Sequence, residues 1–265
     1  MIDIHNHVLI GVDDGPQTEE EAVFLLQQAI DNGITDIIAT PHHYSGDFVN
    51  PGSKILEKVD ELDQIILQHQ LDINVHPGQE IRMNGNFVEE LKSGAGIPLN
   101  QSQYVLVEFS FNEIPNYACP MFYDMQMSGY TPLIAHPERC KPIIKDPDKL
   151  FDYVEKGAVA QVTAGSVAGE LGKNLQETSL KMIEAHLVHL IASDAHHAGL
   201  RPFMLQKAYD VVERELGSIY VEDLKHNAEA VLLGKEVKVK RPSKIETHYK
   251  SNKKKRKKKK FLGLF

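Results

Sequence analysis

The first 22 residues, MIDIHNHVLIGVDDGPQTEEEA (residues 1–22), combine a short apolar strand with an unusual number of metal-binding groups. Alternate residues of a β-strand point to the same side and lie roughly 7 Å apart along the backbone. The imidazoles of His5 and His7 can therefore converge on one cation. The acidic turn that follows contains Asp14, which can supply an oxygen ligand beside them. The stretch thus predicts a strand whose carboxyl end carries a metal site.

A helix follows the first strand, and this order recurs along the chain. Thr18 and Glu21 form a capping box, and Gly33 is placed to end the helix. Further helices are expected over roughly residues 52–70, 117–128, 147–156, 174–187 and 200–216. Strands are expected in seven apolar, β-branched runs: IDIH (2–5), DIIATPHH (36–43), INVHPGQE (73–80), YVLVEFS (104–110), TPLIAHPE (131–138), VAQVTAG (159–165) and HLIASDAHH (189–197). This alternation predicts an α/β fold with a parallel sheet buried on both faces.

The periodicity does not separate a closed barrel from an open doubly wound sheet. The 265 residues suffice for one large α/β domain or two small ones. The sequence has neither the GxGxxG pattern of dinucleotide-binding folds nor a GxxxxGK(S/T) phosphate loop. The usual reason to prefer the open sheet is therefore missing.

The net charge of −8 is unevenly distributed. Residues 253–260 read KKKRKKKK, and removing these eight charges from the 29 basic residues leaves 21 against 37 acidic ones, a net charge of −16. An acidic body is a poor groove for nucleic acid, so no specific nucleic-acid partner is expected. The absence of a long apolar stretch or signal pattern, with only two cysteines, predicts a cytoplasmic protein. We expect a folded domain over residues 1–241 and a disordered polybasic tail over residues 242–265.

Polar residues gather at the carboxyl ends of the predicted strands, where α/β folds build active sites. Nitrogen and carboxylate ligands without thiolate suit zinc, iron or manganese, and the residue types alone do not choose among them. Any one of the histidines could be an ordinary hydrogen-bonded core residue, but five of them beside carboxylates favour a shared metal site. With Asp14 from the turn, the candidate ligands are His5, His7, Asp14, His42, Glu80, Glu108, His136, Asp194 and His196. His43 and His197 are candidates for supporting contacts.

Two of the six arginines, Arg139 and Arg201, follow two of these histidines on loops at the same edge. A guanidinium fork matches phosphate oxygens, so both are candidates for substrate binding and catalysis. The alternative is a solvated loop, or a pair with an acid such as Glu138. A cysteine-based phosphatase needs Cys, five residues and then Arg, and neither cysteine has this spacing. That class is excluded.

Seven motifs, in order DIHNH, DDG, ATPHH, GQE, VEF, AHPER and SDAHH, resemble those of the PHP (polymerase and histidinol phosphatase) superfamily. The resemblance covers residues 1 to about 240 and is greatest to the bacterial tyrosine-protein phosphatase branch of capsule and exopolysaccharide systems. It implies a distorted (β/α)7 TIM-like barrel with its metal site at the C-terminal ends of the strands. It also implies a metal-dependent protein-tyrosine phosphatase whose substrate is an autophosphorylated bacterial tyrosine kinase with a tyrosine-rich tail.

The resemblance further implies three divalent ions, with manganese expected first and iron or zinc as alternatives. One ion would take His5, His7, Glu80 and Asp194. A second would share Glu80 and add Glu108 and His136, and a third would use Asp14, His42 and His196. Arg139 and Arg201 match the phosphate-holding arginines of the branch. Asp13 and Asp14 remain alternatives for the ligand from the turn.

The ending KKKRKKKKFLGLF (residues 253–265) joins a polybasic run to a small apolar cap. This pattern predicts either peripheral binding to the anionic inner face of a membrane or a solvated tail without a specific role. Two alternative functions stay open. One is hydrolysis of histidinol phosphate or another small phosphomonoester, or a PHP nuclease, against which the acidic body weighs. The other is a non-catalytic, metal-stabilised module that binds a kinase.

Overall fold

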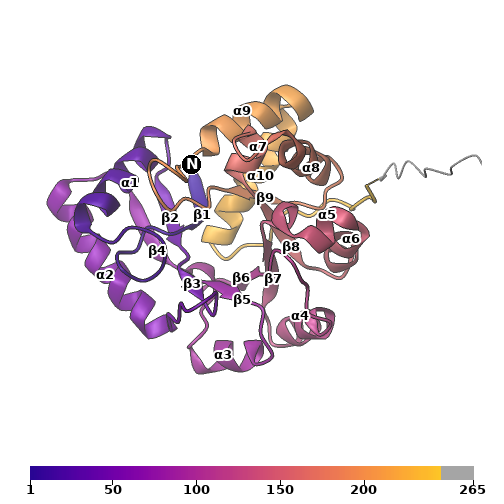
Figure 1. Ribbon diagram of the computed structural model, residues 1–265, viewed down its shortest axis with the longest axis horizontal. Helices are drawn as coiled ribbons and strands as arrows, with labels where there is room; N and C mark the ends of the chain where they lie inside the picture. The colour runs from indigo at the N-terminus through magenta and orange to yellow at the C-terminus, as the bar shows by residue number, and fades with distance from the viewer. Residues whose placement is uncertain (246–265) are drawn as a thin grey trace, which may run out of the picture.

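The strands are parallel and lie at the centre of the protein, with helices around them (Figure 1). The computed structural model describes residues 1–245. One sheet has three strands in the order β1–β2–β4, and the other has six in the order β3–β5–β6–β7–β8–β9. The strands are β1 (Ile2–Asn6), β2 (Asp36–Ala39), β3 (His42–His43), β4 (Asn74–Pro77), β5 (Glu80–Arg82), β6 (Tyr104–Glu108), β7 (Thr131–Ala135), β8 (Val159–Thr163) and β9 (Leu190–Ala192).

Two of the seven expected strands are each divided into two. The run over residues 36–43 contains β2 and β3, and the run over 73–80 leads from β4 into β5. Between β2 and β3, Pro41 has no N–H to donate to a ladder. Between β4 and β5, a Cβ on Gly78 would lie 2.7 Å from Ile38 Cγ2, so only glycine fits this close approach. The first half of each run joins the small sheet and the second half joins the large one.

The first and last strands lie side by side and link the two sheets. Asp194 N donates to His5 O at 2.8 Å, and His7 N donates to Ala195 O at 2.8 Å. Asn6 and Ala195 also form a parallel bridge. In an open doubly wound sheet the two edge strands lie apart, whereas here the last strand returns to the first. The open doubly wound sheet is therefore ruled out. The division into two sheets makes the barrel irregular, and the expected distorted barrel is confirmed.

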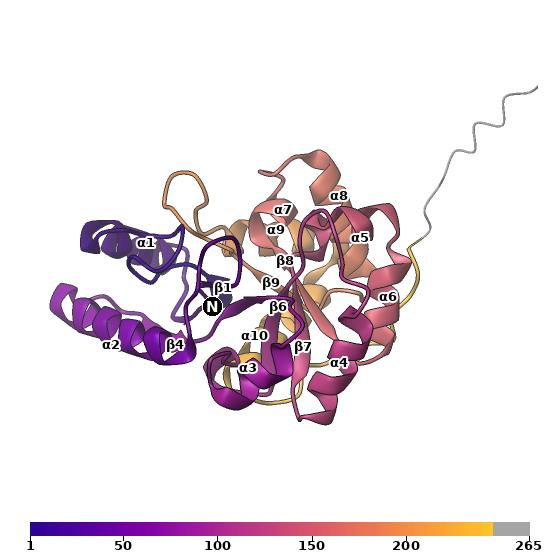
Figure 2. The ribbon, with the colours of Figure 1, turned by 60° about the horizontal axis from the view of Figure 1, so that its bottom comes forward.

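Helices surround the strands. In Figure 1, α1 and α2 flank β1, β2 and β4, and Figure 2 shows these two helices side by side. The α-helices are α1 (Glu19–Asp31), α2 (Gly52–His69), α3 (Phe87–Ser93), α4 (Ala118–Met127), α5 (Lys141–Lys145), α6 (Asp148–Glu155), α7 (Ala164–Ala168), α8 (Lys173–Glu184), α9 (Leu205–Leu216) and α10 (Ser218–Leu232). Two 3₁₀ turns, η1 (Leu99–Gln101) and η2 (Pro137–Arg139), complete the set in the described part of the chain.

The start of α1 follows the predicted capping signal with one change. Thr18 Oγ1 accepts from Glu21 N at 3.3 Å, as expected. The Glu21 carboxylate, however, accepts from Gln17 N at 2.7 Å rather than from Thr18 N. Gly33 follows the helix with φ +76°, a left-handed conformation that suits glycine.

The helices differ from expectation at several places. α8 ends at Glu184 rather than at residue 187, and the short helices α3, α5 and α7 were not predicted. The helix expected over residues 200–216 begins only at Leu205, because residues 200–204 form a loop that contains Pro202. The long helix α10 was also not predicted. Its buried positions include Asn227, Ala228 and Ala230, so small and polar residues hide the apolar stripe that marks a helix in a sequence.

The core has two parts, and the inner one determines where the site can lie. Leu106, Leu133 and Leu190 pack inside the barrel with Ala228 and Val231 of α10. A larger cluster fills the space between the strands and the other helices. Because apolar side chains and α10 fill one end of the barrel, polar side chains are concentrated at the opposite end, where the strands finish.

The chain still contacts the barrel beyond Arg241. Ser243 N donates to Ala185 O at 2.9 Å, and Lys244 Nζ lies 2.7 Å from Asp148 Oδ2. The rest of the predicted tail, including the polybasic run, belongs to residues 246–265, which lie outside the described residues. Within residues 1–245, no helix is both long enough and apolar enough to span a bilayer.

Candidate metal centre

The nine predicted ligands lie together, with Glu80 at their centre. His42 and Glu80 are the first residues of β3 and β5, shortly after the carboxyl ends of β2 and β4. The carboxylate oxygens of Glu80 lie 2.7 Å from His42 Nδ1, 2.9 Å from His136 Nε2 and 3.4 Å from His5 Nε2. His7 Nε2 lies 3.6 Å from the same carboxylate. The strand spacing therefore acts as predicted, because His5 and His7 reach one common partner.

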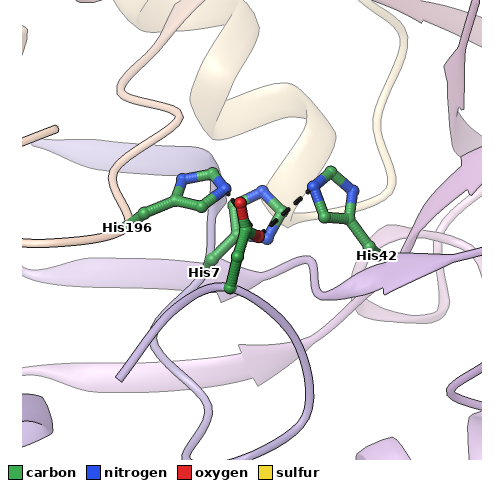
Figure 3. A group of neighbouring side chains, drawn as sticks. His7, His42 and His196 are labelled. Carbon is green, nitrogen blue, oxygen red and sulfur yellow. Dashed lines mark ion pairs between the residues drawn. The ribbon is translucent and has the colours of Figure 1, made fainter. Parts of the chain in front are cut away.

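Two aspartates complete the cluster from opposite sides. Asp194 Oδ1 lies 3.5 Å from Nε2 of both His5 and His7. Asp14 Oδ1 lies 3.2 Å from His196 Nε2 and 3.5 Å from His42 Nε2. Figure 3 shows His42 and His196 on either side of His7.

Ligand atoms within 4.8 Å of one another form three groups among the described residues. They are His5, His7 and Glu80; His42, Glu80 and Glu108; and His7, Asp14, His42 and His196. The groups share Glu80, His42 and His7, so they form one continuous centre. These groups differ from the expected ligand sets in three ways. Glu108 is grouped with His42 rather than with His136, which contacts the other oxygen of Glu80. His7 also belongs to the Asp14 group, and Asp194 belongs to none of the three groups.

The donor atoms fit divalent cations. His5 Nε2, His7 Nε2 and His196 Nε2 are buried and form no hydrogen bond within residues 1–245. Buried polar atoms without partners are costly, and most native structures avoid them. Because these atoms face one another and carry lone pairs, cations bound among them would satisfy the whole set. Imidazole nitrogen and carboxylate oxygen are suitable ligands for manganese, iron and zinc.

The two aspartates of the turn have different surroundings. Asp13 is buried, and its Oδ2 lies 2.6 Å from His7 Nδ1 and accepts from His42 N at 3.0 Å. Asp13 therefore contacts two candidate ligands, His7 and His42, on the side away from the cluster. Asp14 has a side chain that is 47% exposed and faces the cluster directly. At Gly15 a Cβ would lie 2.3 Å from His7 O, so this tight turn needs glycine.

Burial and neighbouring charges set the protonation of the histidines. Burial alone would lower the pKa of His7, but the carboxylates of Asp13, Asp194 and Glu80 together outweigh burial and raise the pKa to about 10. Burial and the adjacent His7 lower the pKa of His196 to about 4, so its ring is neutral near pH 7. A ligating histidine must be neutral, so cation binding at His7 would release a proton.

The buried carboxylates respond differently to their surroundings. Burial works to raise the pKa of Asp194, but His5, His7 and Arg201 together hold it well below its usual range. Burial raises the pKa of Glu108, and the nearby Glu80 carboxylate raises it further. Two carboxylates that repel each other in a buried site are stabilised by a cation between them.

Arg139 and Arg201 meet at one atom of this cluster. Both donate to Asp194 Oδ2, Arg201 from Nη2 at 2.7 Å. The Arg139 guanidinium also lies 4.6 Å from the centroid of the Phe111 ring. The alternative pairing of Arg139 with Glu138 is wrong, because Glu138 Oε1 instead accepts from the backbone and hydroxyl groups of β8 and α7. Both guanidinium groups are partly exposed at the mouth of the centre.

Backbone strain marks two of the candidate ligands. His136 has φ 31° and Asp194 has φ 53°, in the left-handed region that residues with a Cβ rarely adopt. Such conformations cost on the order of 1–3 kcal/mol and cluster at functional sites. In both cases the backbone leaves its strand and turns the side chain toward Glu80 or the arginines.

Several supporting residues were not predicted. Arg82 Nη2 lies 3.1 Å from Glu108 Oε2 and donates to Ser45 Oγ at 2.7 Å. Arg82 lies two residues after Glu80, so the two side chains point to the same side of the strand. This spacing was the signal in the sequence that could have identified Arg82. Thr163 ends β8, the one expected strand to which no polar site residue was assigned.

The two histidines expected to support the site do so mainly through the backbone. His43 Nδ1 accepts from Asn50 N at 3.0 Å, and Asn50 Nδ2 donates to His42 O at 2.8 Å. His197 forms an antiparallel backbone bridge with Arg201. These contacts fix the chain on either side of His42 and Arg201.

The barrel and the histidine–carboxylate centre at its open end define a metallohydrolase type of protein. The chain belongs to the family described as capsular polysaccharide synthesis, CpsB/CapC, whose model matches residues 1–233. The predicted branch of the PHP superfamily is thereby confirmed.

Named relatives agree with this family. The chain is 43% identical over 232 residues to tyrosine-protein phosphatase YwqE of Bacillus subtilis (strain 168), covering 88% of this chain and 91% of the relative. It is 45% identical over 222 residues to the putative tyrosine-protein phosphatase CapC of Staphylococcus aureus, covering 84% and 86%. A crystal structure from work on YwqE and on CpsB from Streptococcus pneumoniae, described as metal-dependent tyrosine phosphatases, matches with a TM-score of 0.91 and 40% identity. That match covers 93% of this chain and 100% of the other.

Proposed function

We propose that the protein is a metal-dependent protein-tyrosine phosphatase that hydrolyses phosphotyrosine on an autophosphorylated bacterial tyrosine kinase in capsule or exopolysaccharide synthesis. The observation that carries this proposal is the meeting of two arginines with a buried histidine–carboxylate cluster at Asp194. Family membership and the activity named for the relatives support it.

The centre would hold three divalent ions, with manganese ahead of iron and zinc. The three groups of ligand atoms support this number, and their shared residues suit closely spaced ions. Asp14 is the turn residue that would bind an ion, because it faces His42 and His196, whereas Asp13 contacts the back of His7. When bound, such ions would activate water as the nucleophile and polarise the phosphoryl oxygens.

The arginines would bind the phosphoryl group. Two guanidinium groups that converge on Asp194 Oδ2 are 21% and 35% exposed, so they are open to a second anion from solvent. Their forks match the equatorial oxygens, where charge must be stabilised in the transition state. Asp194 fixes both guanidiniums in advance, which reduces the ordering needed when substrate arrives.

The chemistry of the tyrosine leaving group and of the cysteines agrees with direct hydrolysis of the phosphate ester, without a cysteine nucleophile. Tyrosine has a pKa of about 10, so its phenolate leaves more readily than an alkoxide and needs less help from a general acid. Cys140 is buried, and burial raises the pKa of its thiol. A buried thiol of raised pKa is a poor nucleophile, in agreement with the absence of the cysteine-phosphatase spacing.

We place the enzyme in the cytoplasm, where a kinase tail would be accessible. Peripheral attachment to an anionic membrane surface through residues 253–265 would bring it near a membrane-associated kinase. Liposome binding that is unchanged after deletion of residues 250–265 would contradict that attachment.

The function is tested by phosphate release from manganese-loaded protein. A phosphotyrosyl peptide, histidinol phosphate and a DNA oligonucleotide are compared, with Arg139→Ala and a chelator as controls. Preference for the peptide that disappears in both controls supports the proposal. Preference for either other substrate would place the enzyme in another branch, and no release from any of the three would favour the kinase-binding module.

A further inference from the structure

A cavity of about 200 Å³ opens beside the two arginines. Its lining includes Arg139, Arg201 and Asp194, whereas the other eight candidate metal ligands are not among its lining residues in the described chain. The cavity is therefore adjacent to the proposed phosphate site and meets the metal-ligand cluster only at Asp194. We call it the arginine-side cavity.

The walls of the arginine-side cavity away from the guanidiniums are largely apolar. Their apolar part is formed by Leu171 between α7 and α8, and by Leu200, Pro202 and Met204 before α9. Ser193 and Glu170 also line the cavity, and the Glu170 carboxylate pairs with Lys207. Leu171 and Leu200 are 47% and 87% exposed. Two exposed leucines at the lip of a cavity leave apolar surface that a ligand could cover.

The size and polarity of the cavity suit an aromatic ring attached to a phosphate. An apolar cavity of about 150 Å³ is known to hold benzene, so about 200 Å³ is sufficient for a phenyl group. Its charged end would hold the phosphoryl oxygens, and its apolar end would hold the ring. An alkyl phosphate of serine or threonine would leave the apolar walls uncovered.

A second feature also points to a ligand. Thr163, which is only 4% exposed, lines the cavity, and its Oγ1 has no hydrogen-bond partner in residues 1–245. A buried hydroxyl without a partner is costly unless a ligand or water satisfies it. An oxygen-bearing ligand seated between the arginines and the leucines would provide that partner.

We propose that the arginine-side cavity binds the phenyl ring of the substrate phosphotyrosine and is a determinant of selectivity over phosphoserine. The inference rests on the proposed phosphatase function for its substrate. The competing position for the ring is Phe111, but the Arg139 guanidinium and the His136 ring already lie 4.6 Å and 5.5 Å from its centroid.

The test compares phenylphosphonate with methylphosphonate, which share a headgroup and differ in the ring. Their dissociation constants for manganese-loaded protein are measured by calorimetry, which does not require turnover. The unmodified protein is expected to prefer phenylphosphonate. The double variant Leu171→Ser, Leu200→Ser is expected to lose on the order of tenfold of that preference. Both leucines are exposed, so the variant should fold normally, and its melting temperature checks this.

Leu67→Ser on α2 is the matched control, because Leu67 is 70% exposed and lies away from the cavity lining. The inference is overturned if the unmodified protein shows no preference, if the double variant keeps it, or if Phe111→Leu abolishes it instead. If the protein hydrolyses a phosphotyrosyl peptide but the double variant keeps its preference for phenylphosphonate, the proposed role of the cavity is rejected and the phosphatase function stands. Loss of the preference in a protein that releases no phosphate from any peptide would reject the phosphatase but keep an aryl-phosphonate site.

Discussion

His7 and Asp13 form a buried pair in which Nδ1 of the ring lies 2.6 Å from Oδ2 of the carboxylate. This contact turns Nε2 of His7 toward Glu80 and Asp194. Asp13 thus determines which ring nitrogen is free for a cation, although it does not face the cluster itself. Carboxylates that orient ligating histidines in this way increase metal affinity.

Asp13→Asn is expected to lower metal affinity or activity by about 10- to 100-fold, because an amide no longer fixes the ring as a carboxylate does. Metal titration of the purified variant measures this. Asp72→Asn, in an exposed loop, is the control. Unchanged affinity in the Asp13 variant would show that the pair does not orient His7.

Asp14→Ala is expected to remove one ion from the centre and to reduce kcat/KM by at least about 100-fold. The reason is that Asp14 is the acidic member of the group of ligand atoms that contains His7, His42 and His196. Elemental analysis should show one metal fewer per chain than in the unmodified protein. A full metal content would instead favour Asp13 as the ligand.

Arg139→Lys and Arg201→Lys should each reduce kcat/KM for a phosphotyrosyl peptide by about 100-fold. Lysine keeps the charge but loses the planar fork that binds two oxygens. Arg214→Lys, on the exposed face of α9, provides the matched control. If the Lys variants kept activity close to that of the unmodified protein, positive charge alone, without the guanidinium fork, would suffice at the mouth of the metal centre.

Metal removal should destabilise the folded protein. A cation that binds only the native state stabilises it by about 2.7 kcal/mol when its free concentration is 100 times the dissociation constant. A chelator is therefore expected to lower the melting temperature of the protein, and the double variant His5→Ala, His7→Ala should respond much less. Equal responses of the two proteins would contradict binding at these histidines.

His189 predicts a pH dependence of stability that is independent of the metal centre. Its Nδ1 accepts from Ala160 N at 3.2 Å, and burial lowers the pKa of the ring from about 6.5 to about 4. Between these values the unfolded chain binds a proton and the folded chain does not, so stability falls as the pH decreases from 6.5 to 4. The full effect is about 3 kcal/mol.

Urea unfolding in chelator at several pH values should show a flatter profile for His189→Gln than for the unmodified protein. Chelator keeps bound metal from contributing to the difference. His226→Gln, at an exposed position of α10, should retain the original profile. Parallel profiles for the His189 variant and the unmodified protein would show that this ring does not control the dependence.

The sequence was most informative where short-range spacing determines geometry. His5 lies in β1 and His7 directly follows it, and the other candidate ligands, apart from Asp14 in the turn, lie in or shortly after the expected strand runs. A parallel barrel brings such positions together at one end. Which ligands share a neighbour depends on side-chain reach across strands, so the grouping of Glu108 with His42 was not predictable. The different roles of Asp13 and Asp14 depend on one tight turn at Gly15. The division of two expected strands at Pro41 and Gly78 depends on contacts between strands.

The pairing of the first strand with the last has a consequence for biosynthesis. The candidate ligands begin at His5 and end at His196, and the backbone bonds that bring these ends together join His5 with Asp194 and His7 with Ala195. A chain emerging from the ribosome therefore carries most of the histidines long before it carries the residues that complete the centre. Because domains are synthesised from the N-terminus, the complete ligand set cannot assemble until β9 and Asp194 have been synthesised.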